Sequence, residues 1–197
     1  MFWKGRGRAE GATTVITFDA DRTAVAAAKA DPAAFESLYR KYVAQIYSLA
    51  LYEMRDAHAA EDVTEQVFLR ALSALPGFRE QGEARDSSFR VWLFSIARNV
   101  IANERRFARR HPQAPIEAAL NLRAADDPAA TVETRLQAQR AWDALMGLPE
   151  ERRQAVVLRF VNELSAREIG QIMGRSEGAV RVLIHRALVS VRHRLEP

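Results

Sequence analysis

Hydrophobic residues recur along this chain at intervals of three and four positions, the spacing that places them on one face of a helix. No stretch shows a convincing alternation of apolar and polar residues, the pattern of a half-buried strand. The sequence therefore predicts an all-α protein. The expected helices cover the segments 32–50, 59–75, 88–110, 131–146, 150–162, 166–173 and 177–195.

Each expected helix carries an apolar stripe that we assign to a core. The first stripe includes Tyr39, Val43 and Tyr47, and Phe160 is expected to face inward near the end of segment 150–162. The stripe of the last helix consists of Val180, Ile184, Ala187, Leu188, Val191 and Leu195. In segment 88–110, Phe94 is expected off the main apolar face. Trp92 is expected in the core, with base stacking as the alternative.

Helix starts and breakers divide the chain. Asp31 and Pro32 have the residue types of an N-cap and a first helical position. Pro76 and Gly77 end a helix, and prolines and aspartates mark 111–130 as a linker. The expected parts are a mobile tail (1–30), a helical domain (31–110), the linker (111–130) and a second small helical domain (131–197).

Charge is unevenly distributed along the chain, and this distribution indicates more about the partners of the protein than its net charge of +4 does. Residues 10–65 contain ten acidic and five basic residues, whereas 89–110 contain six arginines and one glutamate. Residues 165–195 again contain six arginines, against two glutamates. Two basic segments on separate expected helices favour a nucleic-acid partner over ordinary solvated charge.

Several classes of protein are disfavoured. The chain has no cysteine, so disulfides and cysteine-ligated zinc are excluded, and no apolar run is long enough for membrane insertion. The N-terminus has no apolar stretch typical of a secretory signal. The four histidines are scattered, and we find no nucleophile–base pair or phosphate loop. We expect a soluble cytoplasmic protein that is not an enzyme and needs no metal or cofactor.

The C-terminal segment LSAREIGQIMGRSEGAVRVLIHRALVSVRHRL predicts a helix-turn-helix. Ser165 and Glu168 have capping-box spacing, Gly174 suits a turn with positive φ, and Ser176 can cap the second helix. Such a second helix enters the DNA major groove, and its exposed residues contact bases or phosphates. The candidate DNA-binding residues are Arg175, Ser176, Arg181, His185 and Arg186. The alternative is an amphipathic hairpin with a solvated basic face.

The middle segment FRVWLFSIARNVIANERRFARR also combines an apolar and a basic face. We expect its arginines, among them Arg98, Arg105 and Arg106, to follow a phosphate backbone, and Asn99 and Asn103 to reach bases. The polar loop before it could hold an unstacked base, or could be a plain connection.

Three segments of the chain together resemble the bacterial sigma-70 family. They are AEDVTEQVFLRAL at 60–72, the middle segment at 89–110, and LPEERRQAVVLRFVNELSAREIGQIMGRSEGAVRVLIHRAL at 148–188. Specifically, the chain is similar to the extracytoplasmic-function (ECF) group of RNA polymerase sigma factors over about residues 30–195. The resemblance implies two helical domains that read the −10 and −35 promoter elements and promote strand opening.

The resemblance also implies partners. Asp62, Glu65, Gln66 and Arg70 fall on the surface that docks on the β′ clamp helices of core RNA polymerase, although relatives often have Gln-Glu where this chain has Glu65-Gln66. The segment before the helix-turn-helix is similar to the part that grips the β flap. Members of the group are commonly inhibited by an anti-sigma factor, which is therefore an expected partner beside promoter DNA.

For the −10 element, the resemblance points to the loop and the basic middle helix. The matching residues are Phe78, Arg79, Ser87, Ser88, Arg98, Asn99, Asn103, Arg105 and Arg106. For the −35 element, Arg181, His185 and Arg186 match, whereas Leu183 stands where many relatives have a basic residue, which suggests a different −35 preference. The competing interpretation is a stand-alone regulator that uses only the C-terminal module.

Overall fold

The computed structural model describes residues 18–81, 88–110 and 132–195. Over these ranges the chain is helical, without a strand, which confirms the predicted all-α class. The α-helices are α1 (Phe18–Ala30), α2 (Phe35–Met54), α3 (Ala57–Ala74), α4 (Ser88–Arg110), α5 (Val132–Met146), α6 (Glu150–Phe160), α7 (Ala166–Met173) and α8 (Glu177–Leu195). Two short 3-10 helices, η1 (Pro32–Ala34) and η2 (Leu75–Gly77), precede α2 and follow α3. The expected linker lies outside the described residues.

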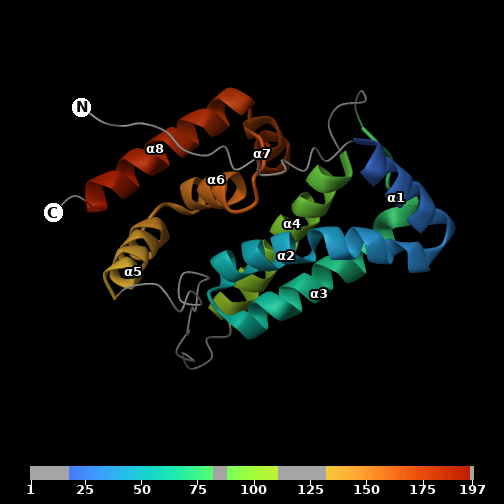
Figure 1. Ribbon diagram of the computed structural model, residues 1–197, viewed down its shortest axis with the longest axis horizontal. Coiled ribbons are helices and arrows are strands. Elements are labelled where there is room, and N and C mark those ends of the chain that lie inside the picture. Colours follow the sequence, from blue (N-terminus) through green and yellow to red (C-terminus); the bar gives the residue numbers. More distant parts are fainter. Residues whose placement is uncertain (1–17, 82–87, 111–131, 196–197) are drawn as a thin grey trace, which may run out of the picture.

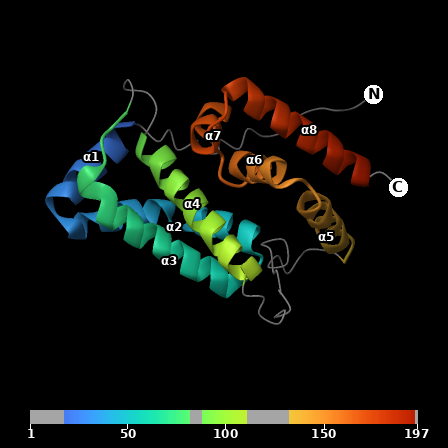
Figure 2. The same ribbon diagram turned by 180° about the vertical axis from the view of Figure 1, so that it is seen from behind.

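The helices form two groups that lie side by side (Figure 1). Helices α1 to α4 pack around one another, and α8 packs across α5, α6 and α7. The groups meet where α4 contacts α7 and α2 contacts α6, as the reverse view also shows (Figure 2). Buried side chains continue from one group into the other through this boundary.

Local signals explain where the first helices begin and end. The Asp31 carboxylate accepts a hydrogen bond from the Ala33 amide at 2.9 Å, so Asp31 caps η1 as the sequence predicted. Asp56 caps α3 through the Ala59 amide at 2.7 Å. Between α2 and α3, Arg55 takes a left-handed conformation with φ 61°, which reverses the chain in two residues.

Residues 18–30 correct the expectation of a tail, because they form α1 and pack on α2. The Asp21 carboxylate is buried, accepts a hydrogen bond from the Tyr42 hydroxyl at 2.5 Å and forms an ion pair with Lys41. A buried carboxylate needs such partners to offset its lost hydration. These contacts join α1 to the bundle; residues 1–17 lie outside the described ranges.

Several expectations about which side chains are buried are wrong. Phe94 is fully buried, whereas Phe160, Leu188 and Leu195 are 57%, 45% and 44% exposed. Helix α8 is covered on one side by α5, α6 and α7, so one face of it receives no neighbour among the described helices. Periodicity defines an apolar stripe, but the width that becomes buried depends on how many helices surround it.

We expect Tyr42→Phe to lower the free energy of unfolding by about 2 kcal/mol, because it removes a buried hydrogen bond to a carboxylate. Burial, and then the Asp21 interactions, raise the pKa of Tyr42 above its ordinary value. The folded state therefore favours the neutral phenol, and its contribution to stability is complete below about pH 10 and is lost as pH rises above that.

Urea unfolding of both proteins between pH 8 and pH 11 tests this expectation. The difference in stability between wild type and Tyr42→Phe should shrink above about pH 10, the ordinary tyrosine pKa. A difference that stays constant across this range would contradict the assigned role of the buried phenol.

Candidate functional site

The helix-turn-helix has the geometry that its sequence predicts. Ser165 accepts a hydrogen bond from the Glu168 amide at 3.2 Å, and the Glu168 carboxylate accepts one from the Ser165 amide at 2.7 Å. Gly174 ends α7 with φ 66°. The Ser176 hydroxyl then accepts a hydrogen bond from the Ala179 amide at 3.2 Å, capping α8. These contacts set where α7 begins and ends and where α8 begins.

Helix α8 presents its predicted basic residues to solvent. Arg181, His185 and Arg186 are exposed and spaced four and one residues apart, so they share one side of the helix. Arg181 forms an ion pair with Glu177, and Arg175 pairs with Glu151 at 2.6 Å. Exposed pairs of this kind contribute little to stability, so both arginines are available to a phosphate.

Other residues of α8 and its cap have structural contacts. Ser176 is exposed but serves as the N-cap. Leu183 is half-buried and packs against the core. Arg194 donates a hydrogen bond to the Ala144 carbonyl of α5 at 2.9 Å. No local pattern in the sequence indicates this contact, since its partner lies fifty residues away.

The described residues on either side of segment 82–87 have defined contacts. Phe78 is buried against Phe89 and Trp92, with ring centroids 5.8 and 4.9 Å away, and its carbonyl accepts a hydrogen bond from Lys29. The Ser88 hydroxyl accepts a hydrogen bond from the Gln81 amide at 3.1 Å. Phe78 and Ser88 therefore have defined contacts on either side of segment 82–87, which lies outside the described residues. Half-buried Trp92 joins this aromatic cluster, as the core interpretation predicted.

The other residues predicted on and before α4 divide into two sets. Arg79, Asn99, Asn103 and Arg106 are exposed, and the Asn103 side chain accepts a hydrogen bond from Arg106 at 2.6 Å. Arg98 and Arg105 instead face the C-terminal helices. Ser87 lies outside the described residues.

On α3, the predicted docking residues Asp62, Glu65 and Arg70 are exposed and Gln66 is half-buried. Beside them lies a groove between α2 and α3. Its lining consists of Tyr39, Val43, Tyr47, Glu61, Thr64, Glu65 and Phe68. The α2 residues of this groove were expected in the core, because they follow one another at helical spacing. Their stripe is wider than one core-facing side, and this width is the signal that could have revealed the groove.

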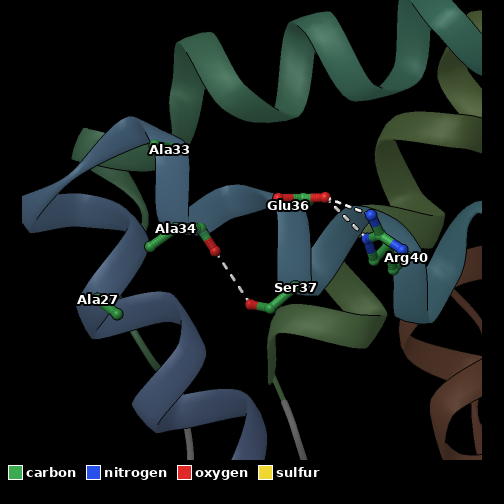
Figure 3. A pocket seen from close by; sticks show the side chains of 6 residues that line it. All are labelled: Ala27, Ala33, Ala34, Glu36, Ser37 and Arg40. Carbon is green, nitrogen blue, oxygen red and sulfur yellow. Dashed lines mark hydrogen bonds and ion pairs between the residues drawn. The ribbon is translucent and has the colours of Figure 1, made fainter.

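A second depression lies between α1, η1 and the start of α2 (Figure 3). Alanines form much of its lining, and Glu36 pairs with Arg40 beside it at 2.6 Å. Besides this exposed i,i+4 ion pair, the Ser37 hydroxyl donates a hydrogen bond to the Ala34 carbonyl at 3.0 Å, and neither contact forms a binding site. Within the described ranges there is also no cluster of potential metal ligands and no helix long and apolar enough to cross a membrane.

Comparison with known protein families identifies both groups of helices. Residues 38–111 match the model of sigma-70 region 2, and residues 138–191 match the model of sigma-70 region 4. The chain is also 31% identical over 187 residues to the RNA polymerase sigma-H factor of Pseudomonas aeruginosa, covering 86% of this chain and 90% of that protein. This chain belongs to the sigma-70 family.

Further similarity identifies it as an ECF sigma factor. It is 34% identical over 156 residues to the ECF sigma factor BldN of Streptomyces coelicolor, an alignment that covers 79% of this chain and 58% of that protein. The solved structure of CnrH with the cytosolic domain of CnrY is similar in fold, with a TM-score of 0.67 and 25% identity over 90% of this chain and 98% of that one. Sigma factors direct promoter-specific transcription initiation by RNA polymerase and catalyse no reaction themselves.

Regions 2 and 4 of this sigma factor meet through buried polar side chains. Glu53 on α2 accepts hydrogen bonds from Arg105 at 2.9 Å and from Arg153 of α6 at 3.2 Å. Arg105 also pairs with Glu150 at 2.7 Å. Arg98 donates a hydrogen bond to Gln154 at 3.1 Å. Region 4 thus contacts two of the arginines predicted to bind DNA.

The close packing of α7 on the turn before α8 should make Gly170 intolerant of substitution. A Cβ atom at Gly170 would lie 2.7 Å from the Arg175 carbonyl oxygen, whereas a Cβ atom at Gly178 would meet nothing within 4 Å. We expect Gly170→Ala to destabilise region 4 by about 1–3 kcal/mol through this steric clash. Gly178→Ala should be neutral or stabilise it by about 0.5 kcal/mol. Urea unfolding followed by circular dichroism checks both; equal effects would contradict the close approach.

Proposed function

We propose that region 2 of this sigma factor docks on core RNA polymerase through α3 and the neighbouring groove. The groove is apolar at Tyr39, Val43 and Phe68 and acidic at Glu61 and Glu65. Such a surface fits a helix with apolar and basic residues, because complementary charge guides the encounter and apolar burial stabilises the complex. The β′ clamp helices are the proposed occupant, with the β flap held by the part of region 4 before the helix-turn-helix.

We further propose that α4 and the loop before it read the −10 element and that α8 reads the −35 element. The observation that carries this function is the presence of two exposed basic helix faces, one in region 2 and one in region 4, together with an apolar and acidic groove between α2 and α3. Extruding a base from the duplex costs a few kcal/mol, which contacts to the base and its phosphates must offset. Asn99, Asn103 and Arg106 are exposed on α4 for such contacts.

An anti-sigma factor is a further proposed partner. CnrH, a structural relative, was solved with the cytosolic domain of CnrY. A protein that covered the α2–α3 groove would compete with core polymerase for the same apolar and acidic side chains. Binding to polymerase also implies that this chain works in the cytoplasm.

Transcription by sigma-free core polymerase on sheared genomic DNA tests the proposed function. With the protein added, RNA 5′-end sequencing should reveal new start sites that share two upstream motifs. A protein that protects duplex DNA without polymerase, and that does not bind core, would instead be a stand-alone regulator.

We expect the double variant Asp62→Lys, Glu65→Lys to weaken core binding by at least about tenfold, because it reverses the charge beside the groove. Both side chains are exposed, so thermal stability should change little. Affinity for labelled core polymerase is the measurement. Glu36→Lys is the control, since Glu36 is an exposed acidic residue on the α1 side of the same bundle. Equal weakening by the control would remove the assignment of the docking surface.

We expect Arg186→Ala to weaken binding to promoters that have a −35 element by about 1–3 kcal/mol, the contribution of a guanidinium that contacts a base in bidentate fashion. Transcription from these promoters should fall accordingly. Core affinity should be unaffected, because Arg186 lies on the exposed side of α8. The control is the same promoter with its −35 element scrambled, where wild type and variant should be equally active. A loss of core binding would show that this side of α8 has another role.

A further inference from the structure

The groove between α2 and α3 leaves apolar and acidic side chains open on one surface. The two helices lie side by side in both views (Figures 1 and 2), and the groove between them has a volume of about 310 Å³. Tyr39 is 43% exposed, and its ring packs edge-on against Phe68 with the centroids 4.8 Å apart. Glu61 and Glu65 line the groove from α3 and are exposed. An occupant of this groove therefore combines large apolar side chains with positive charge.

The carboxylates of this surface are not neutralised by the rest of the described structure. Among the described residues, Glu61 pairs with His58 alone, at 3.8 Å, and both side chains are largely exposed. Asp62 and Glu65 form no ion pair with any residue of the described ranges. A basic segment therefore meets three carboxylates without displacing a strong internal partner.

The chain itself carries a segment of the matching composition before α1. Residues 1–8 read MFWKGRGR, three large apolar residues followed by three basic ones interspersed with glycine, and the first acidic residue is Glu10. The other segments outside the described ranges, 82–87, 111–131 and 196–197, contain no phenylalanine, tryptophan or tyrosine. Since aromatic side chains supply the largest apolar contact area per residue, residues 1–8 are the part of the chain that fits an apolar and acidic groove.

The point where this segment joins the fold lies close to the groove. Helix α1 begins at Phe18, and three residues later the buried Asp21 carboxylate accepts a hydrogen bond from Tyr42 of α2 at 2.5 Å. Tyr42 directly precedes Val43, which lines the groove. The fifteen residues from Trp3 to Phe18 span up to about 50 Å when extended, whereas a helix is about 10–12 Å across. The segment is therefore long enough to pass around α2.

We propose that residues 1–8 bind in the α2–α3 groove of their own chain and compete there with core RNA polymerase. This inference rests on the proposed docking role of the groove. In this arrangement Phe2 and Trp3 supply the apolar contacts, and the three basic residues meet the carboxylates of α3. A tethered segment has an effective concentration on the order of millimolar, so a contact that is weak between separate molecules still fills the groove in the free chain.

A dye on α2 tests whether the segment occupies the groove, without any polymerase. The full chain contains no cysteine, so bimane attached at Ala44→Cys, an exposed position next to Val43, labels one site. A tryptophan quenches this dye on contact, and Trp3→Phe keeps an aromatic side chain but removes the quencher. We expect bimane emission to rise in Trp3→Phe when the dye is at position 44. It should stay the same when the dye is at Val189→Cys on α8, the matched control.

The charge of the groove gives a second arm to this experiment. In the background of Glu61→Lys with Glu65→Lys, the segment should leave the groove, because like charges now face each other. Trp3→Phe should then have no effect on the emission of bimane at position 44. Circular dichroism melting checks that each variant is folded.

Affinity for labelled core polymerase tests the competition. We expect Phe2→Ser with Trp3→Ser to bind core about fivefold more tightly than wild type, because the apparent affinity is reduced by the fraction of chains whose groove is already filled. Val15→Ser with Ile16→Ser is the matched control. It removes two apolar side chains from the same segment but outside residues 1–8, so its core affinity should equal that of wild type.

Equal bimane emission with and without Trp3 at position 44 would overturn the proposal. Equal core affinity of the two serine double variants would overturn the competition, even with quenching at the groove. Core binding that is unaffected by Asp62→Lys with Glu65→Lys would contradict the proposed docking function and the competition with it. The bimane result is obtained without polymerase, so it still decides whether the segment binds the groove.

Discussion

The placement of regions 2 and 4 relative to each other depends on the contacts of the Glu53 carboxylate. Its side chain is fully buried near the end of α2, where it accepts from one arginine of α4 and one of α6. A buried glutamate without partners would cost several kcal/mol. While Glu53 is buried, Arg105 of region 2 and Arg153 of region 4 balance its charge. When the regions separate, water hydrates all three charges.

This arrangement explains why the boundary has one defined orientation. Apolar contacts, such as the Tyr52 and Trp142 rings with centroids 4.9 Å apart, are independent of orientation. The hydrogen bonds of Glu53, Arg98 and Asn162 require one relative placement of the regions. Since buried ion pairs add little net stability, these bonds determine how the regions dock more than how strongly.

The sequence predicted most of what is local. Capping residues and glycines placed the helix boundaries of the helix-turn-helix, since Ser165, Gly174 and Ser176 act on backbone groups within a few residues. The family resemblance gave the order of the regions, which the family models confirm. The interpretation of 1–30 as a tail was wrong for α1, whose attachment depends on Asp21 meeting Tyr42, a contact that no local pattern contains.

The sequence could not predict which basic residues are already paired. Arg98 and Arg106 look equivalent as arginines on the polar side of one helix, yet Arg98 contacts a glutamine 56 residues away and Arg106 contacts its own helix. Leu183 illustrates the same limit on α8. Its departure from the basic residue of many relatives suggested a changed −35 preference, but its half-buried side chain packs on the core.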